Sequence, residues 1–209
     1  MRWIAFSLVV LLVLGCPSAP DEDASSDEVT SEGINIQEDP LGALSALAGI
    51  GDELQTLQQE LEEMPDVEAV HFNDLMPSLP DPLDGYTADD AKGSTNQMGD
   101  TKISSVNRTY RADEGEGEVR IEISDWAFHK ALYLPFVMQS KFSQETTEGW
   151  NKGIKVGEDP GREQYQSNSQ TGERMVLLRK RFPVKIAIRN LPPEAFDEWW
   201  AAVKKDELP

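Results

Sequence analysis

The chain has 209 residues, enough for one small domain with flanking segments, and a formal net charge of −19. Residues 17–91 contain 20 Asp and Glu and no Lys or Arg, whereas residues 92–209 contain 18 charged residues of each sign. The acidic part would be repelled by phosphates, which excludes nucleic acid as an expected partner and disfavours binding flat on an anionic membrane.

The first 15 residues have the features of a secretory signal peptide. Arg2 precedes an apolar run at Ile4–Leu14, which has the length of a signal-peptide core rather than of a membrane span. The run ends in Val-Leu-Gly-Cys at residues 13–16, which resembles the bacterial lipobox, and this resemblance implies that Cys16 is acylated. The alternative is an ordinary signal peptide with an incidental cysteine.

Cys16 is the only cysteine, which excludes an intrachain disulfide and a cysteine-based metal site. Lipidation of the lipobox type adds several acyl chains, and two or more chains anchor a protein stably in a bilayer. We therefore predict a lipid-anchored protein of the bacterial cell envelope. Residue 17 is Pro rather than Asp, which in the sorting pattern that the sequence resembles favours the outer membrane, on its periplasmic or its surface-exposed side.

Two segments are predicted ahead of the folded domain. Residues 16–39 are rich in Ser, Asp, Glu, Pro and Ala, which indicates a disordered acidic tether. Residues 40–64 are predicted to form an amphipathic helix, bounded by Pro40 and Pro65. Its apolar stripe recurs at spacings of three and four: Leu47, Ile50, Leu54, Leu57, Leu61 and Met64. We expect the stripe to pack on the protein's own domain; the alternatives are a partner or fraying, because glycines weaken the helix.

A turn-rich connector at residues 65–82 leads to a folded domain at residues 83–209. Apolar alternation between turn signals predicts six strands, at 101–111, 118–126, 150–156, 162–168, 173–179 and 182–189. A hairpin loop is predicted at 113–117, and the last four strands are expected to form an antiparallel meander.

Two helices are predicted in the domain. One covers residues 128–142, with Pro135 as a kink or a break. The other follows Pro193 and places Phe196, Trp200 and Val203 on one face. The predicted fold class is α+β: an antiparallel, meander-like sheet of about six strands with helices packed on one face.

The sequence carries no catalytic, cofactor or metal-binding signature. His71 and His129 have no ligand spacing with each other or with a cysteine. The paired glycines at 49–51 and 115–117 lack the third glycine of a nucleotide fingerprint. Acidic pairs such as 89–90 lack the spacing of a calcium loop and fit a solvated face. We predict no cofactor and no metal.

Two features are candidates for a binding surface. The domain is rich in tryptophan, which often lines peptide or glycan grooves. Adjacent Trp199 and Trp200 cannot both face inward on a helix, so at least one is expected to be partly exposed. A basic cluster at a hairpin tip could hold an anion or the acidic N-terminal segment; core packing and a solvated turn are the structural alternatives. The candidate residues are Trp126, Trp150, Trp199, Arg179, Lys180 and Arg181.

Short motifs made of turn glycines and apolar core positions extend from Val67 to the end of the chain. They are Phe72-Asn73-Asp74-Leu75, Leu83-Asp84-Gly85-Tyr86, Met98-Gly99, Arg108-Thr109-Tyr110, Ile121-Glu122-Ile123, Pro135-Phe136, Gly149-Trp150, Pro160-Gly161 and Val176-Leu177-Leu178 ahead of Arg181-Phe182. With these motifs, about two thirds of the chain resembles a family of uncharacterised bacterial exported proteins and lipoproteins. The resemblance supports the fold and implies no catalytic residue.

The expected function is that of a non-enzymatic envelope lipoprotein. Its partners would be the bilayer, through acylated Cys16, and an envelope protein or other envelope component; the oligomeric state is left open. The alternative is an envelope hydrolase or another enzyme with an unrecognised site. A deep pocket with converging polar groups and a perturbed carboxylate would favour the enzyme, and a flat or aromatic groove would favour binding.

Overall fold

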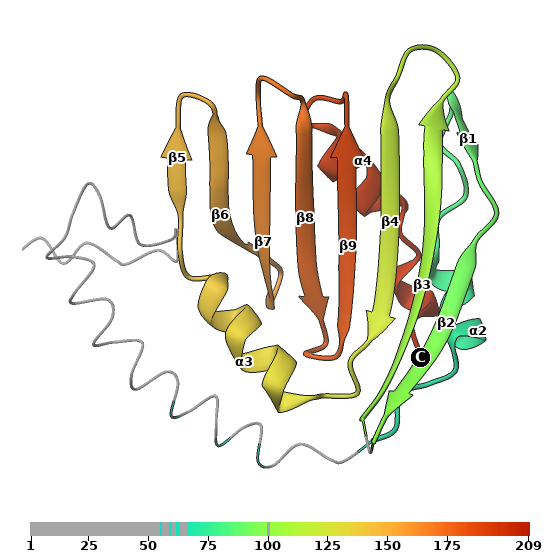
Figure 1. The fold of residues 1–209 in the computed structure, drawn as a ribbon, viewed down its shortest axis with the longest axis vertical. Coiled ribbons are helices and arrows are strands. Elements are labelled where there is room, and N and C mark those ends of the chain that lie inside the picture. Colours follow the sequence, from blue (N-terminus) through green and yellow to red (C-terminus); the bar gives the residue numbers. More distant parts are fainter. Residues whose placement is uncertain (1–54, 56–58, 60–61, 63–66, 100) are drawn as a thin grey trace, which may run out of the picture. The chain divides into compact units, whose positions relative to one another are not determined.

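The computed structural model describes residues 67–99 and 101–209, together with Gln55, Gln59 and Glu62. Cys16, the predicted tether and most of the helix predicted at 40–64 lie outside the described residues. An antiparallel sheet dominates the described part of the chain (Figure 1). Its nine strands are β1 (Tyr86–Ala88), β2 (Lys92–Met98), β3 (Thr101–Ala112), β4 (Glu118–Asp125), β5 (Gln144–Thr146), β6 (Gly149–Val156), β7 (Asp159–Gln166), β8 (Thr171–Leu178) and β9 (Phe182–Arg189).

Within residues 67–99 and 101–209, three α-helices and two 3-10 helices accompany the sheet. They are α2 (Phe72–Leu75), η1 (Met76–Ser78), α3 (Lys130–Gln139), α4 (Ala195–Ala202) and η2 (Lys205–Glu207). The helix predicted at 128–142 is one continuous helix, α3, with Pro135 inside it. Pro135 removes one backbone hydrogen bond without dividing the helix.

The strand order is β1-β3-β4-β9-β8-β7-β6-β5, and β2 also pairs with β3. β1 and β2 pair with successive parts of the same edge of β3, because Ala88 lies opposite Tyr110 and Lys92 lies opposite Asn107. After β4 the chain passes through α3 to the far edge of the sheet. The hairpins from β5 to β9 then return until β9 pairs with β4 (Figure 1). The predicted meander is confirmed.

The α+β class is confirmed, but the sheet has nine strands, not about six. The six predicted strands correspond to β3, β4, β6, β7, β8 and β9. The strands missed are β1, β2 and β5. The sequence of β2 is KGSTNQM, which lacks apolar alternation, and β5 has three exposed residues. These strands lie at the edges of the sheet, where the hydrophobic pattern that reveals half-buried strands is not required.

The main core lies on the face covered by α2 and α4, which we call the covered face. Alternate residues of a strand point to the same face, and those of the central strands are buried there: Val119, Ile121, Ile123, Val184, Ile186 and Ile188. On α4 the inward residues are Phe196 and Trp199, followed by Val203. Trp200, which the sequence placed on this face instead of Trp199, is half-buried. The ring of Trp199 packs 4.4 Å from that of Tyr110.

The segment predicted as a connector, residues 65–82, contributes to this core. Leu75 is fully buried and Leu79 is 5% exposed, and both belong to the main cluster. Residues 75–79 of the predicted connector are therefore part of the folded core, which the sequence placed only from residue 83 onward. The same segment forms α2 and η1, beside the edge made by β1 and β2 (Figure 1).

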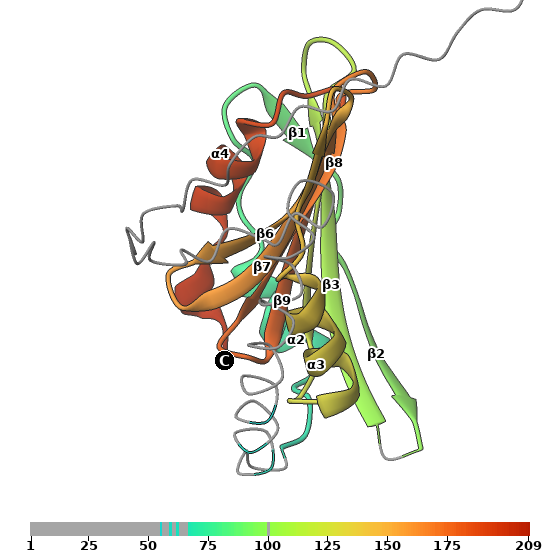
Figure 2. The same cartoon turned by 90° about the vertical axis from the view of Figure 1, so that its left-hand side faces the viewer.

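Among the helices of residues 67–209, α3 alone lies on the opposite face of the sheet, which we call the open face (Figure 2). Tyr133, Phe136 and Val137 of α3 form a small second cluster with Leu177 of β8. Gly153 of β6 allows the end of α3 to approach closely, because a Cβ there would lie 1.7 Å from the carbonyl oxygen of Ser140. The prediction that the helices pack on one face is therefore wrong, since α3 and α4 lie on opposite faces.

Candidate binding surface

Polar and charged side chains cover much of the open face beyond α3. Lys185 of β9 lies 3.3 Å from Glu122 of β4, measured from Nζ to Oε2. Arg162 of β7 lies 3.2 Å from Glu173 of β8, from Nη2 to Oε1. All four side chains are between about a quarter and a third exposed. Such pairs stabilise the fold little, typically by less than about 1 kcal/mol, and their charged groups are accessible to a ligand.

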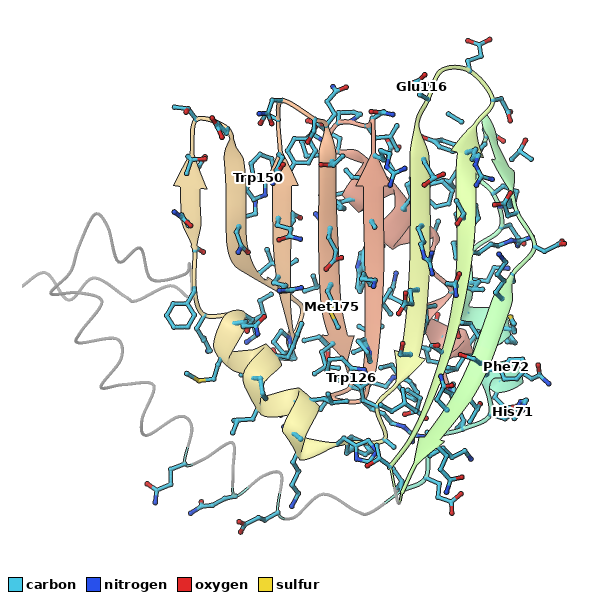
Figure 3. The ribbon with its side chains drawn as sticks, in the orientation of Figure 1. His71, Phe72, Glu116, Trp126, Trp150 and Met175 are labelled. Carbon is cyan, nitrogen blue, oxygen red and sulfur yellow. The ribbon has the colours of Figure 1, made fainter. Side chains whose placement is uncertain are left out.

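A pocket of about 270 Å³ lies between these two ion pairs, and we call it the Trp126 pocket. It is lined by Glu122, Ser124, Trp126, Arg162, Glu173, Met175, Pro183 and Lys185. Figure 3 shows Trp126 and Met175 near the same end of the sheet, beside α3. The indole of Trp126 is held edge-on against Phe136 of α3, with ring centroids 6.1 Å apart. The pocket thus joins an apolar wall to charges of both signs.

Trp150 lines a second pocket, of about 230 Å³, near the turns that follow β5 and β7. This pocket is lined by Gln144, Thr146, Glu148, Gly149, Trp150, Asn151, Tyr165, Gln166 and Asn168. Most of these residues are exposed. The indole of Trp150 is fixed, because its Nε1 donates to Glu163 Oε1 at 3.0 Å and its ring packs 5.0 Å from that of Tyr165.

Glu163 is a nearly buried carboxylate on the covered face, and it is 4% exposed. Besides the Trp150 indole, its oxygens accept a hydrogen bond from Arg174 Nε at 2.7 Å and lie 3.3 Å from Lys152 Nζ. Arg174 also reaches Asp197 of α4, at 2.7 Å. Because several donors surround the carboxylate, this cluster fits a structural role in holding α4 to the sheet.

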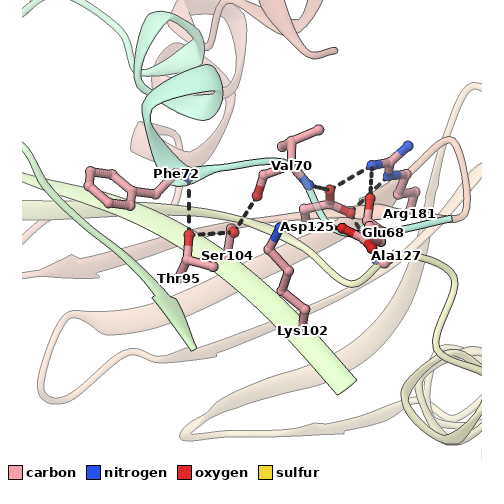
Figure 4. Close-up of polar contacts among 9 residues, drawn as sticks. All are labelled: Glu68, Val70, Phe72, Thr95, Lys102, Ser104, Asp125, Ala127 and Arg181. Atoms are coloured by element: carbon pink, nitrogen blue, oxygen red, sulfur yellow. Dashed lines mark hydrogen bonds and ion pairs between the residues drawn. The ribbon is translucent and has the colours of Figure 1, made fainter. Parts of the chain in front are cut away.

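The basic cluster at residues 179–181 holds two ends of the domain together. Arg181 makes a bidentate contact with Asp125, with Nε at 2.8 Å from Oδ1 and Nη2 at 2.7 Å from Oδ2. Arg181 Nη2 also donates to the carbonyl oxygen of Glu68, and the backbone N–H of Val70 donates to Asp125 Oδ2 at 2.8 Å (Figure 4). Ser104 Oγ completes the contact by donating to the Val70 carbonyl. We call this set the entry clasp.

Arg179 binds the C-terminal part of the chain. Its Nη1 donates to the carbonyl oxygen of Leu208 at 3.1 Å, and its backbone N–H donates to Asp159 Oδ1 at 2.8 Å. Lys180 is engaged in an interaction as well. Arg179 and Lys180 have φ of 52° and 57°, which is typical of a tight hairpin turn. Arg181 contacts the chain at Glu68 only through the backbone carbonyl, and the acidic segment at 16–39 lies outside the described residues.

The three candidate tryptophans therefore differ. Trp126 and Trp150 line the two pockets, whereas Trp199 is fully buried in the core and is no part of an exposed surface. Sequence reasoning missed Met175, Arg162, Glu173, Glu122 and Lys185. Their positions on alternate residues of adjacent strands could have shown that they share a face, but the neighbours of each strand follow only from the topology.

Two exposed carboxylates with shifted pKa values lie outside both pockets. A hydrogen bond from Lys204 lowers the pKa of Asp81, and a hydrogen bond from Arg111 lowers the pKa of Asp89. A lowered pKa keeps a carboxylate ionised at neutral pH, which is unfavourable for a general acid. Among the described residues, His, Cys, Asp and Glu form no group of three or more that could hold a metal ion.

Comparison with known proteins found no matching family, no matching curated protein and no matching solved structure. Within residues 67–99 and 101–209, no helix has both the length and the apolar character needed to cross a membrane.

Proposed function

We propose that this chain is a lipid-anchored protein of the bacterial envelope whose α+β domain is a non-enzymatic binding module. The anchoring part rests on the sequence, namely the signal-peptide pattern and the lipobox-like end at Cys16. The resemblance to exported proteins and lipoproteins agrees with it. The binding part rests on one observation, the Trp126 pocket on the open face.

The composition of the Trp126 pocket favours a ligand with both apolar and polar groups. Trp126, Met175 and Pro183 can cover an apolar side chain. Two carboxylates and two cations in the lining balance each other, so the pocket carries no net charge and does not select for a polyanion. An extended peptide segment of an envelope protein, with one apolar side chain and a polar backbone, has this combination of groups.

An enzymatic function remains the alternative, but the residues that line the Trp126 pocket include few groups suited to catalysis. Ser124 is the nucleophilic side chain among the described residues of the Trp126 pocket, and it is buried. Activation of a serine requires a neighbouring base such as histidine or lysine. Lys185, the lysine of the lining, is paired with Glu122.

Affinity capture from the protein's own membranes tests the binding role. The lipidated wild-type protein should retain an envelope component that Trp126→Ala loses. The matched control is Lys155→Ala, which removes an exposed residue of the open face that neither lines the pocket nor pairs with a lining residue. Equal capture by Trp126→Ala and by the wild type would refute the role of the pocket.

Membrane fractionation tests the anchor separately. Cys16→Ala should leave the protein soluble or uncleaved, because the acyl chains would be its anchor. Recovery of the wild-type protein mainly in the soluble fraction would contradict lipidation and leave the pocket proposal unaffected.

A further inference from the structure

Helix α3 is apolar on two opposite sides. Its inner side, formed by Tyr133, Phe136 and Val137, is buried against the sheet. A second set of apolar residues recurs at spacings of three and four on the other side, and each member is partly or fully exposed. We call this set the outer stripe: Ala131, Leu134, Pro135, Met138 and, beyond the end of α3, Phe142. With 3.6 residues per turn, the outer stripe lies opposite the inner side.

The outer stripe is not explained by the described core. Neither hydrophobic cluster of the described residues includes any of its members. A helix that is hydrophobic all round is normally buried all round. The sheet covers one side of α3, so the other side presents an apolar surface on which a second helix can pack.

The N-terminal segment enters the domain next to the start of α3. The entry clasp holds Glu68 and Val70 against Arg181 and Asp125. The backbone N–H of Trp126, immediately after Asp125, donates to the Arg181 carbonyl at 3.1 Å, and α3 begins at Lys130. Glu68 follows Met64 by four residue steps, which span at most about 14 Å. A helix that ends at residue 64 can therefore reach the beginning of α3.

The preceding segment has the complementary pattern. Gln55, Gln59 and Glu62 are helical and exposed, and their spacing of four and three residues puts them on one side of a helix. Leu54, Leu57 and Leu61, which the sequence predicts as an apolar stripe, would lie on another side. Along a helix Leu54–Leu61 would span about 11 Å, the same length as Ala131–Met138, the part of the outer stripe within α3.

We propose that residues 47–64 form a helix that packs antiparallel on the outer stripe of α3. The entry clasp sets the direction, because the end of this helix must lie near the start of α3. In that arrangement Leu61 faces Ala131, Leu57 faces Leu134 and Pro135, and Ile50 faces Phe142. The N-terminal tether then leaves from the far end of α3.

Charge supports the same arrangement. Lys130 and Lys141 are the charged residues between 126 and 143, and Lys130, in the first turn of α3, lies on one flank of the outer stripe. On a helix at residues 47–64, Glu53 and Glu60 would lie on one flank of the Leu54–Leu61 stripe, and antiparallel packing would bring Glu60 close to Lys130. Parallel packing would separate them. A second copy of α3 is a poorer occupant, because its lysines would meet like charges.

Cysteine pairing in the full chain tests the contact. Leu57→Cys with Leu134→Cys should form an intrachain disulfide, identified by mass spectrometry of the digested protein. Gln59→Cys with Leu134→Cys is the matched control, because Gln59 is exposed on the other side of the helix. Equal linkage in both variants, linkage between chains, or no 57–134 linkage in folded protein would overturn the proposal. Linkage between chains would identify a second copy as the occupant.

A charge exchange gives a second, independent measurement. Lys130→Glu should lower the melting temperature by about 2–4 °C, the shift that 1 kcal/mol produces in a domain of this size. Glu60→Lys alone should also lower it, and the double variant should recover most of the loss. If the double variant instead showed the sum of the two single losses in melting temperature, the pairing of Lys130 with Glu60 would be refuted. The inference does not depend on what the Trp126 pocket binds.

Discussion

The two faces of the sheet use the same strands for different purposes. Asp125 and Glu122 lie three residues apart on β4 and face opposite sides of the sheet. On the covered face, Asp125 is fully buried and bound by Arg181 and two backbone N–H groups. On the open face, Glu122 pairs with Lys185 and remains partly exposed. Strand alternation thus separates the groups that hold the fold from those available to a ligand.

The largest expected effect comes from the core tryptophan of the covered face. Trp199→Ala should lower the free energy of unfolding by about 3–5 kcal/mol, because it removes a fully buried ring between Tyr110 and Tyr86. Trp126→Ala, at the half-buried edge of the open face, should cost clearly less. Urea denaturation followed by circular dichroism measures both. Equal losses would break the division between a face that holds the fold and a face that contributes little to stability.

Mutation of the entry clasp should cause the second-largest loss of stability. Asp125→Ala leaves Arg181 without its partner and two backbone N–H groups without their acceptor, and removal of one member of a buried ion pair costs about 3 kcal/mol or more. Glu122→Ala, the control on the same strand, should cost less than about 1 kcal/mol because its ion pair is exposed. If denaturant midpoints fell equally for the two variants, the clasp would be no stronger than a surface pair.

The smallest effect concerns pH and the covered face. Burial raises the pKa of Tyr110 to about 12, and its hydroxyl donates to the Pro80 carbonyl at 2.8 Å. The folded state therefore holds this proton more tightly than the unfolded state, whose tyrosine pKa is about 10. The stability that this difference in pKa contributes is fully present below pH 10 and is lost as the pH rises towards 12.

Tyr110→Phe isolates that contribution from the other groups that titrate in alkaline solution. At neutral pH the variant should be about 1 kcal/mol less stable than the wild type, because it lacks the hydrogen bond to Pro80. Its free energy of unfolding should also fall less steeply than that of the wild type between pH 9 and 11. Parallel stability curves for the two proteins over this range, from urea denaturation, would show that the hydroxyl does not titrate with unfolding.

Sequence patterns predicted the strands that bury one face and missed those that do not. The alternation at Val119, Ile121 and Ile123 identified β4, whereas the polar β2 gave no such signal. On α4, Phe196, Trp199 and Val203 satisfy helical spacing as well as Phe196, Trp200 and Val203 do. Only the packing against Tyr110 selects Trp199.

The candidate surface shows the same limit of local patterns. Tryptophan content drew attention to Trp126, which lines a pocket, but the ion pairs around it join residues from four strands. Arg181 could be recognised as basic from the sequence, yet its partner Asp125 is 56 residues away. A charge at a hairpin tip therefore indicates a binding group only after its distant partners are known.

The entry clasp also has a mechanical consequence. A force applied to the N-terminal segment would act on the domain at Glu68–Val70, where Arg181 and Asp125 bind the chain. Asp125 ends β4, and Arg181 precedes β9, which pairs with β4 inside the sheet. Part of a load applied at the N-terminal segment would therefore pass to two interior strands, and not only to the free edges at β2 and β5.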